Sequence, residues 1–198
     1  MNLDEYRTVF AAGSLVLILI AAAPTLSLLV SFPSGSERFS ELWVLGSNHV
    51  TDDYPFDIVV NTTYRVFVGV GNHMGSSSYY LVYVKFRNQT QSPPNATTSE
   101  PSPLPPLYEF RTFVADNGTW EVPLTFRVLE ASRTDNFMFV GRLSINDVVF
   151  SVNSSARWDS KHNGFYYQLF FELWLYNTAS QSFQFHNRFV GIWLNITA

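Results

Sequence analysis

The sequence predicts an all-β protein, an antiparallel Ig-like β-sandwich preceded by one N-terminal transmembrane α-helix. Three observations lead to this prediction. Apolar and polar residues alternate with a period of two in several segments beyond Ser40. Turn-forming residues separate these segments at short intervals, and one long uncharged stretch lies near the N-terminus. The 198 residues fit one β domain of ordinary size behind the helix.

The uncharged stretch covers residues 8–30, TVFAAGSLVLILIAAAPTLSLLV. As a helix it would reach about 34 Å, which is enough to cross a hydrocarbon core of about 30 Å. A cleaved signal peptide is the alternative, because Ala21 and Ala23 resemble a cleavage site. However, acidic residues precede the stretch, Pro24 would follow the cut, and the apolar run continues beyond it. We therefore expect an uncleaved signal anchor.

Six N-glycosylation sequons follow this stretch, whereas the content of Asn, Ser and Thr predicts about two to three by chance. Because such glycans are bulky and lie on exported surfaces, we predict a cell-membrane protein with its C-terminal domain outside. Residues 1–7 would be a short cytoplasmic N-terminus, 8–30 the transmembrane segment, 31–39 a linker and 40–198 an extracytoplasmic β-sandwich. The candidate acceptors are Asn61, Asn88, Asn95, Asn117, Asn153 and Asn195.

Alternation defines the expected strands of the outer domain. In residues 80–87 the even positions are apolar, while Lys85 and Arg87 lie on the other face, and in residues 165–175 Glu172 lies opposite the apolar face. Turn signals separate the segments, so eight to ten strands are expected and no amphipathic helix. The predicted strands are 42–45, 58–60, 64–70, 80–87, 108–115, 120–128, one or two within 137–152, 165–175 and 185–196.

Residues 89–106, QTQSPPNATTSEPSPLPP, contain six of the ten prolines and show no strand pattern. One interpretation is a polyproline ligand at 103–106. The other is an extended loop that follows the surface, and we expect this loop because proline-recognising modules are typically intracellular.

The composition excludes several classes of function. The net charge of −4 provides no basic field for a phosphate backbone, so we expect no nucleic-acid partner. With no cysteine, the chain has no disulfide, no thiolate metal site and no cysteine nucleophile.

Motifs for catalysis are also weak. Gly69-Val70-Gly71 lacks the third glycine of a dinucleotide motif and is better interpreted as a strand end. The adjacent acids Asp52 and Asp53 could offer oxygen ligands to calcium, but such pairs usually face water. We expect no catalytic, cofactor-binding or metal-binding residue, no small-molecule substrate and no enzyme activity. The histidines, which are scattered without ligand spacing, are His49, His73, His162 and His186.

Tryptophans offer one further possibility, since exposed indole rings can stack on sugars. Aromatic residues in strands more often belong to the core, and this is the interpretation that we favour. The candidates are Trp43, Trp158, Trp174 and Trp193.

Residues 39–88 resemble an archaeal family of predicted membrane proteins, domain of unknown function 1616. The resemblance rests on a strand ending in Leu-Gly, the element Asp53-Tyr54-Pro55, the Gly-x-x-Asn-His element at 69–73 and a Tyr-x-Val-x-Val strand at 80–84. It implies archaeal origin and an outer β domain, and it assigns no functional residue. Family members carry several spans ahead of this region, whereas we expect one in this chain.

Together these observations predict a non-catalytic surface protein that acts as an interaction or stabilising module. Its partners would be membrane lipid and one or more proteins of a larger membrane or envelope complex, with no cofactor other than possible N-linked glycans. Two alternatives stay open. A pilin-like filament subunit also joins an apolar helix to a glycosylated β domain, and a glycan-binding module would use exposed tryptophans.

Overall fold

The computed structural model describes residues 6–7, 9–18, 20 and 37–197, which belong to two units, Met1–Arg38 and Phe39–Ala198. In the first unit, residues 6–7, 9–18 and 20 are helical. No helix formed by the described residues is both long enough and apolar enough to cross a membrane. The rest of the predicted span, at residues 8, 19 and 21–30, lies outside the described residues.

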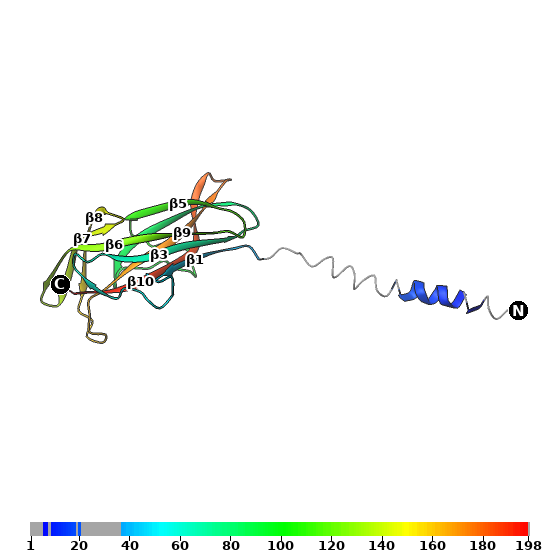
Figure 1. Ribbon diagram of the computed structural model, residues 1–198, viewed down its shortest axis with the longest axis horizontal. Helices are drawn as coiled ribbons and strands as arrows, with labels where there is room; N and C mark the ends of the chain where they lie inside the picture. Colours follow the sequence, from blue (N-terminus) through cyan, green and yellow to red (C-terminus); the bar gives the residue numbers. More distant parts are fainter. Residues whose placement is uncertain (1–5, 8, 19, 21–36, 198) are drawn as a thin grey trace. The chain divides into compact units, whose positions relative to one another are not determined.

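Within residues 37–197, ten strands form two packed five-stranded sheets, so the predicted all-β sandwich is confirmed (Figure 1). One sheet has the order β1-β3-β6-β7-β8 and the other the order β2-β10-β9-β4-β5. The strands are β1 Phe39–Leu45, β2 Asp57–Val59, β3 Tyr64–His73, β4 Ser78–Asn88, β5 Tyr108–Val114, β6 Thr119–Thr134, β7 Phe137–Ile145, β8 Val148–Arg157, β9 Tyr166–Asn177 and β10 Ser182–Thr197.

One strand pairing differs from the antiparallel prediction. β2 runs parallel to β10, with Asp57 opposite Asn195 and Val59 opposite Thr197. The other pairings of the two sheets are antiparallel. Alternation shows where a strand lies but carries no information on its direction. β2 follows β1 of the opposite sheet along the chain and pairs with β10 at the edge of its own sheet.

The core lies between the sheets and is built from every second residue of the strands. Tyr80, Val82 and Val84 of β4 are fully buried, and Leu169 and Phe171 of the neighbouring β9 belong to the same cluster. Burying each large apolar side chain contributes about 1.5–3 kcal/mol. The alternation that predicts the strands therefore also supplies the main stabilisation of the sandwich.

Gly69 of β3 lies beneath the indole ring of Trp43 of β1. A Cβ atom at position 69 would be 2.1 Å from Trp43 Cε2, so a side chain would collide with the ring. Trp43 Nε1 donates a hydrogen bond to Glu121 Oε2 of β6 at 2.9 Å, and the three residues are aligned across β1, β3 and β6. The glycine in Gly69-Val70-Gly71 thus makes room for a tryptophan.

The Asn72 side chain is a buried hydrogen-bonding centre near the end of β3. Its Nδ2 donates to the carbonyl oxygens of Ser76 and Val114, both at 2.8 Å. Its Oδ1 accepts from the Met74 N–H at 3.1 Å and from the Tyr80 hydroxyl at 3.0 Å. These bonds hold the connection between β3 and β4, which crosses from one sheet to the other, against the end of β5. The asparagine of the Gly-x-x-Asn-His element therefore has a structural explanation.

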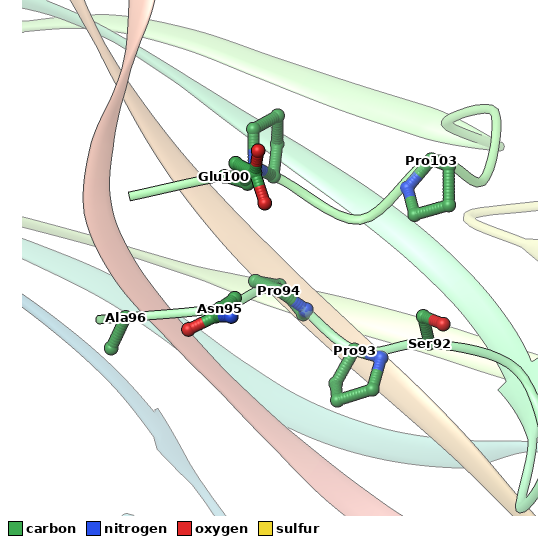
Figure 2. Close-up of a pocket in the computed structure, with 8 residues that line it drawn as sticks. Ser92, Pro93, Pro94, Asn95, Ala96, Glu100 and Pro103 are labelled. Carbon is green, nitrogen blue, oxygen red and sulfur yellow. The ribbon is translucent and has the colours of Figure 1, made fainter. Parts of the chain in front are cut away.

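The proline-rich segment 89–106 folds over the outward face of the β2-β10-β9-β4-β5 sheet. Its two legs run side by side (Figure 2) and are joined by paired backbone hydrogen bonds between Asn95 and Glu100. At the tip, Asn187 of β10 donates a side-chain hydrogen bond to the Ala96 carbonyl at 3.0 Å. The segment thus covers part of a sheet face that would otherwise meet solvent.

A buried ion pair lies beneath this segment. Lys85 Nζ is 2.9 Å from Glu172 Oε2, and the two side chains are 4% and 0% exposed. Ser102 of the segment accepts a hydrogen bond from Lys85 Nζ through its carbonyl and donates one to Glu172 Oε1 through its N–H, both at 2.8 Å. Both charged residues occupy the outward face, as the alternation predicts, but the segment shields them from water.

Candidate interaction surface

Four aromatic residues form a row across the outward face of β5, β4, β9 and β10, which we call the aromatic row. Phe113 pairs with Tyr79, and Tyr176 pairs with Phe183. Tyr79 stacks on Phe113 with 4.2 Å between ring centroids and lies 5.1 Å from Phe183. Tyr176 lies 5.3 Å from Phe183. Cross-strand contacts thus connect the four rings into one surface.

Three further aromatic residues extend the row. Trp174 lies 5.5 Å from the ring of Tyr83 and 5.8 Å from the ring of Phe185. We call these three residues and the aromatic row together the aromatic patch. Phe113 keeps 74% of its surface exposed, and the other six residues are half-buried. The open face of an antiparallel sheet is usually polar, so a contiguous aromatic surface there indicates a binding site.

A charged pair borders the patch on β5. Arg111 Nε donates to Glu109 Oε1 at 2.9 Å, and the Arg111 guanidinium lies 5.5 Å from the ring centroid of Phe183. Within the patch, Trp174 Nε1 donates to the buried Glu172 at 3.3 Å. An aromatic centre with a polar rim is the usual composition of a protein–protein contact.

The four histidines have different partners. Within the part of the chain that the structure describes, no three His, Asp or Glu side chains lie close enough to hold a metal ion. Of the acidic pair 52–53, Asp53 accepts hydrogen bonds from Ser47 and Asn48. The histidine contacts are His49 with Glu121 at 2.9 Å, His73 with Asn117 at 3.2 Å, His162 with Asp159 at 2.8 Å and His186 with Ser40 at 3.1 Å.

His186 belongs to a chain of hydrogen bonds that joins the two sheets. Its Nε2 is 3.1 Å from Ser40 Oγ, which is 2.7 Å from the Tyr80 hydroxyl, and Tyr80 donates to Asn72. Burial, and to a smaller extent the charge of Arg188, lowers the pKa of His186 below its ordinary value. Burial raises the pKa of Tyr80. Both groups are therefore held in their neutral forms.

The six sequon asparagines fall into two groups. Asn88 and Asn195 are half-buried, and their Nδ2 atoms, to which a glycan would be attached, donate to Ser155 O at 2.7 Å and to Asp57 Oδ1 at 2.8 Å. The other four are exposed: Asn61, Asn95, Asn117 and Asn153.

The tryptophans only partly follow the expectation of a core position. Trp120 and Trp158 pack against the core. Trp43, Trp174 and Trp193 instead lie on outward faces of the sheets, because they occupy the opposite phase of the alternation. Trp193 is 40% exposed.

Sequence reasoning missed the aromatic patch. The available signal was the presence of aromatic residues at both phases of the alternation in β4 and β9, such as Tyr79 beside Tyr80. A strand that is apolar on both faces has both faces covered. The alternation predicts the core face alone, so this second surface does not follow from it.

The sequence matches the family described as Domain of unknown function (DUF1616) over residues 33–140, which is more than half of the chain. The chain belongs to this family. The matched region of this DUF1616 member reaches from β1 into β7 and includes Asn72, Tyr79 and Phe113. The residues of the aromatic patch on β9 and β10 lie beyond it. A comparison with curated proteins gives no match.

Three solved structures illustrate the similarity of the DUF1616 chain to known β domains. The CARDB domain of the PF1109 protein from Pyrococcus furiosus, in complex with di-metal ions, is 7% identical, with a TM-score of 0.41 over 84% of this chain and 99% of that one. A beta-glucosidase from Listeria innocua in complex with gluconolactone is 8% identical (TM-score 0.37; 82% and 16%). The ASH / PapD-like domain of human CEP192 is 10% identical (TM-score 0.27; 80% and 84%). These values transfer no function to this chain.

Proposed function

We propose that this protein is a non-catalytic, single-pass cell-surface protein whose β-sandwich binds a protein partner through the aromatic patch. It would serve as an accessory subunit of a larger membrane or envelope complex. The exposed ring of Phe113, stacked on Tyr79 at the edge of a continuous aromatic surface, is the observation that carries this proposal.

The proposed anchor is supported by the N-terminal residues. The stretch 8–30 has no charged side chain, and the described helical residues 9–18 expose apolar side chains such as Val9, Phe10 and Leu17. A helix that is apolar on all sides is favoured in lipid and unfavourable in water. The N-terminus would lie in the cytoplasm, and the sequons of the outer domain would carry glycans.

The proposed partner presents an apolar surface with a polar margin. Phe113 is the exposed anchor and would enter a pocket of the partner, while Tyr79, Tyr176 and Phe183 support it from the side. Large aromatic side chains at the centre of a contact carry most of the binding free energy. Arg111 and Glu109 at the margin would contribute mainly to orientation.

Site-specific photo-crosslinking in native membranes tests this contact. A benzoylphenylalanine at position 113 should form one discrete crosslinked product. The same group at position 149 is the control, because Val149 is 51% exposed but belongs to β8 of the other sheet. The product should be absent there.

A variant completes the test. The partner identified by crosslinking should no longer co-purify with Phe113→Arg in mild detergent. The thermal unfolding temperature of this variant should be unchanged, since the side chain is outside the core. A monodisperse monomer with no stoichiometric partner, or a partner that the variant retains, would contradict the proposal.

A further inference from the structure

We propose that a second site on this domain binds one neutral pyranose ring, stacked on Trp193. The site is a pocket of about 640 Å³ near the end of β10. Its aromatic walls are Trp193, Phe56 and Tyr166, with the rings of Phe56 and Tyr166 6.0 Å apart. The aromatic patch contains none of these residues, so this site goes beyond the proposed protein contact.

The aromatic walls stand in a fixed arrangement. The Arg87 guanidinium lies 5.0 Å from the centroid of the Trp193 ring, and Arg87 Nε donates to Gln168 Oε1 at 2.7 Å. The Tyr166 hydroxyl donates to the His162 carbonyl at 2.5 Å. Trp193 nevertheless keeps 40% of its surface exposed and Phe56 keeps 46%. Preorganised and open aromatic rings suit the apolar C–H face of a sugar ring.

Polar groups of the pocket match the hydroxyl edge of such a ring. Gln89 donates from Nε2 to Arg157 O at 2.6 Å, and its buried Oε1 has no hydrogen-bond partner among the described residues. Because this oxygen is itself closed to solvent, the polar groups offered to a sugar hydroxyl are Asp159 and His162. Nδ1 of His162 is hydrogen-bonded to Asp159 Oδ2 at 2.8 Å, so the other ring nitrogen, Nε2, is left for the ligand.

The charges of the pocket favour a neutral ligand. The six lining residues include one carboxylate, Asp159, and no Lys or Arg. The hydrogen bond from His162 lowers the pKa of Asp159, so the carboxylate stays ionised. Sialic acids, uronic acids and phosphorylated sugars would therefore be disfavoured, because Asp159 repels their charge. The cation beside Trp193, Arg87, is buried and already hydrogen-bonded to Gln168 and to the Gln91 carbonyl.

A pyranose could reach the pocket from two sources. One is a separate glycan of the cell surface. The other is a glycan on the chain itself, because Asn195 follows Trp193 by two residues on the same face of β10 and its N–H donates to Phe56 O at 2.7 Å. The chemistry at the pocket is the same in both cases.

The first arm of the test uses the full chain from a bacterial host without N-glycosylation, in a detergent with no sugar head group. D-glucose, D-galactose, D-mannose and N-acetyl-D-glucosamine are titrated and followed by saturation-transfer NMR. A ring of about 12 non-hydrogen atoms supports affinity on the order of millimolar, so concentrations reach tens of millimolar. At least one sugar should receive saturation.

Variants assign the signal to the pocket. Trp193→Ala should weaken binding about tenfold, whereas Trp193→Phe should retain most of it. Val149→Ala, at a residue that is 51% exposed on β8 of the other sheet, is the control and should bind normally. The absence of saturation for all four sugars, or equal binding by Trp193→Ala in a folded protein, would overturn the proposal without affecting the crosslinking result at position 113.

The second arm distinguishes the sources. Mass spectrometry of the Asn195 peptide from native membranes shows whether this residue is modified. Occupied Asn195, together with free-sugar binding that appears only after glycan removal, identifies the chain's own glycan as the ligand. Unmodified Asn195 with binding in the native protein identifies a separate glycan.

Discussion

Lys85 of β4 and Glu172 of β9 form an ion pair whose third member, the backbone of Ser102, comes from the proline-rich segment above them. Each charge is satisfied by the other and by one main-chain group, and Glu172 also accepts a hydrogen bond from Trp174 Nε1. The pair therefore connects the stability of the sheet to the position of segment 89–106. Without the segment, the pair would face solvent on the outside of the sandwich.

Breaking this pair should strongly destabilise the domain. Glu172→Ala or Lys85→Ala leaves one buried charge without its partner, and we expect the free energy of unfolding to fall by about 3–5 kcal/mol. Urea denaturation measures this change. The double variant Lys85→Met/Glu172→Leu should recover most of the loss, because it leaves no charge to be compensated. Arg111→Ala, which breaks an exposed pair, should have little effect.

Gly69 should tolerate no side chain. In Gly69→Ala the new methyl group would overlap the Trp43 ring, and we expect a loss of about 1–3 kcal/mol from overpacking. Gly71→Ala is the matched control, since its nearest neighbour at 2.6 Å is the flexible end of Glu41. The thermal unfolding temperature of Gly71→Ala should be well above that of Gly69→Ala. Equal losses would argue against the tryptophan as the cause.

Stability should decrease in mild acid through His186. Because the folded state lowers the pKa of this histidine, the unfolded chain binds a proton first, and protonation favours unfolding. The free energy of unfolding has its full value above the pKa of about 6.5 that His186 has in the unfolded chain. Below that pH the free energy of unfolding decreases, by at most about 1.4 kcal/mol per pH unit. Urea denaturation at several pH values between 7.5 and 5 measures this. The free energy of unfolding should decrease more steeply with falling pH for the native chain than for His186→Gln.

Glycan occupancy should follow exposure. We expect Asn61, Asn95, Asn117 and Asn153 to be modified in protein from native membranes. Asn88 should stay largely unmodified, because its Nδ2 donates to Ser155 O and its Oδ1 accepts from the N–H groups of residues 90 and 91. Glycopeptide mass spectrometry of each site measures this. Full occupancy of Asn88 would mean that its hydrogen bonds open before the domain closes.

The sequence predicts the strands well because alternation and burial have the same physical origin. Tyr80, Val82 and Val84 are apolar and also lie in the core. The covering of the outward face was not predictable in the same way. Lys85 and Glu172 are 87 positions apart in sequence, and nothing in either strand indicates that they will pair or that the backbone of Ser102 will hydrogen-bond to both. The parallel direction of β2 and the row formed by Phe113, Tyr79, Tyr176 and Phe183 depend likewise on contacts between distant segments.

The composition of segment 89–106 has a thermodynamic consequence. Six of its 18 residues are prolines, whose ring restricts the backbone before the chain folds. The disordered ensemble of the segment is therefore already narrow, and less conformational entropy is lost when it settles on the sheet. A glycine-serine segment of equal length would still span the same distance, but it would bind to the sheet face more weakly. The protein thus carries a semi-rigid cover over part of one sheet face and leaves the aromatic patch on the same face open for another molecule.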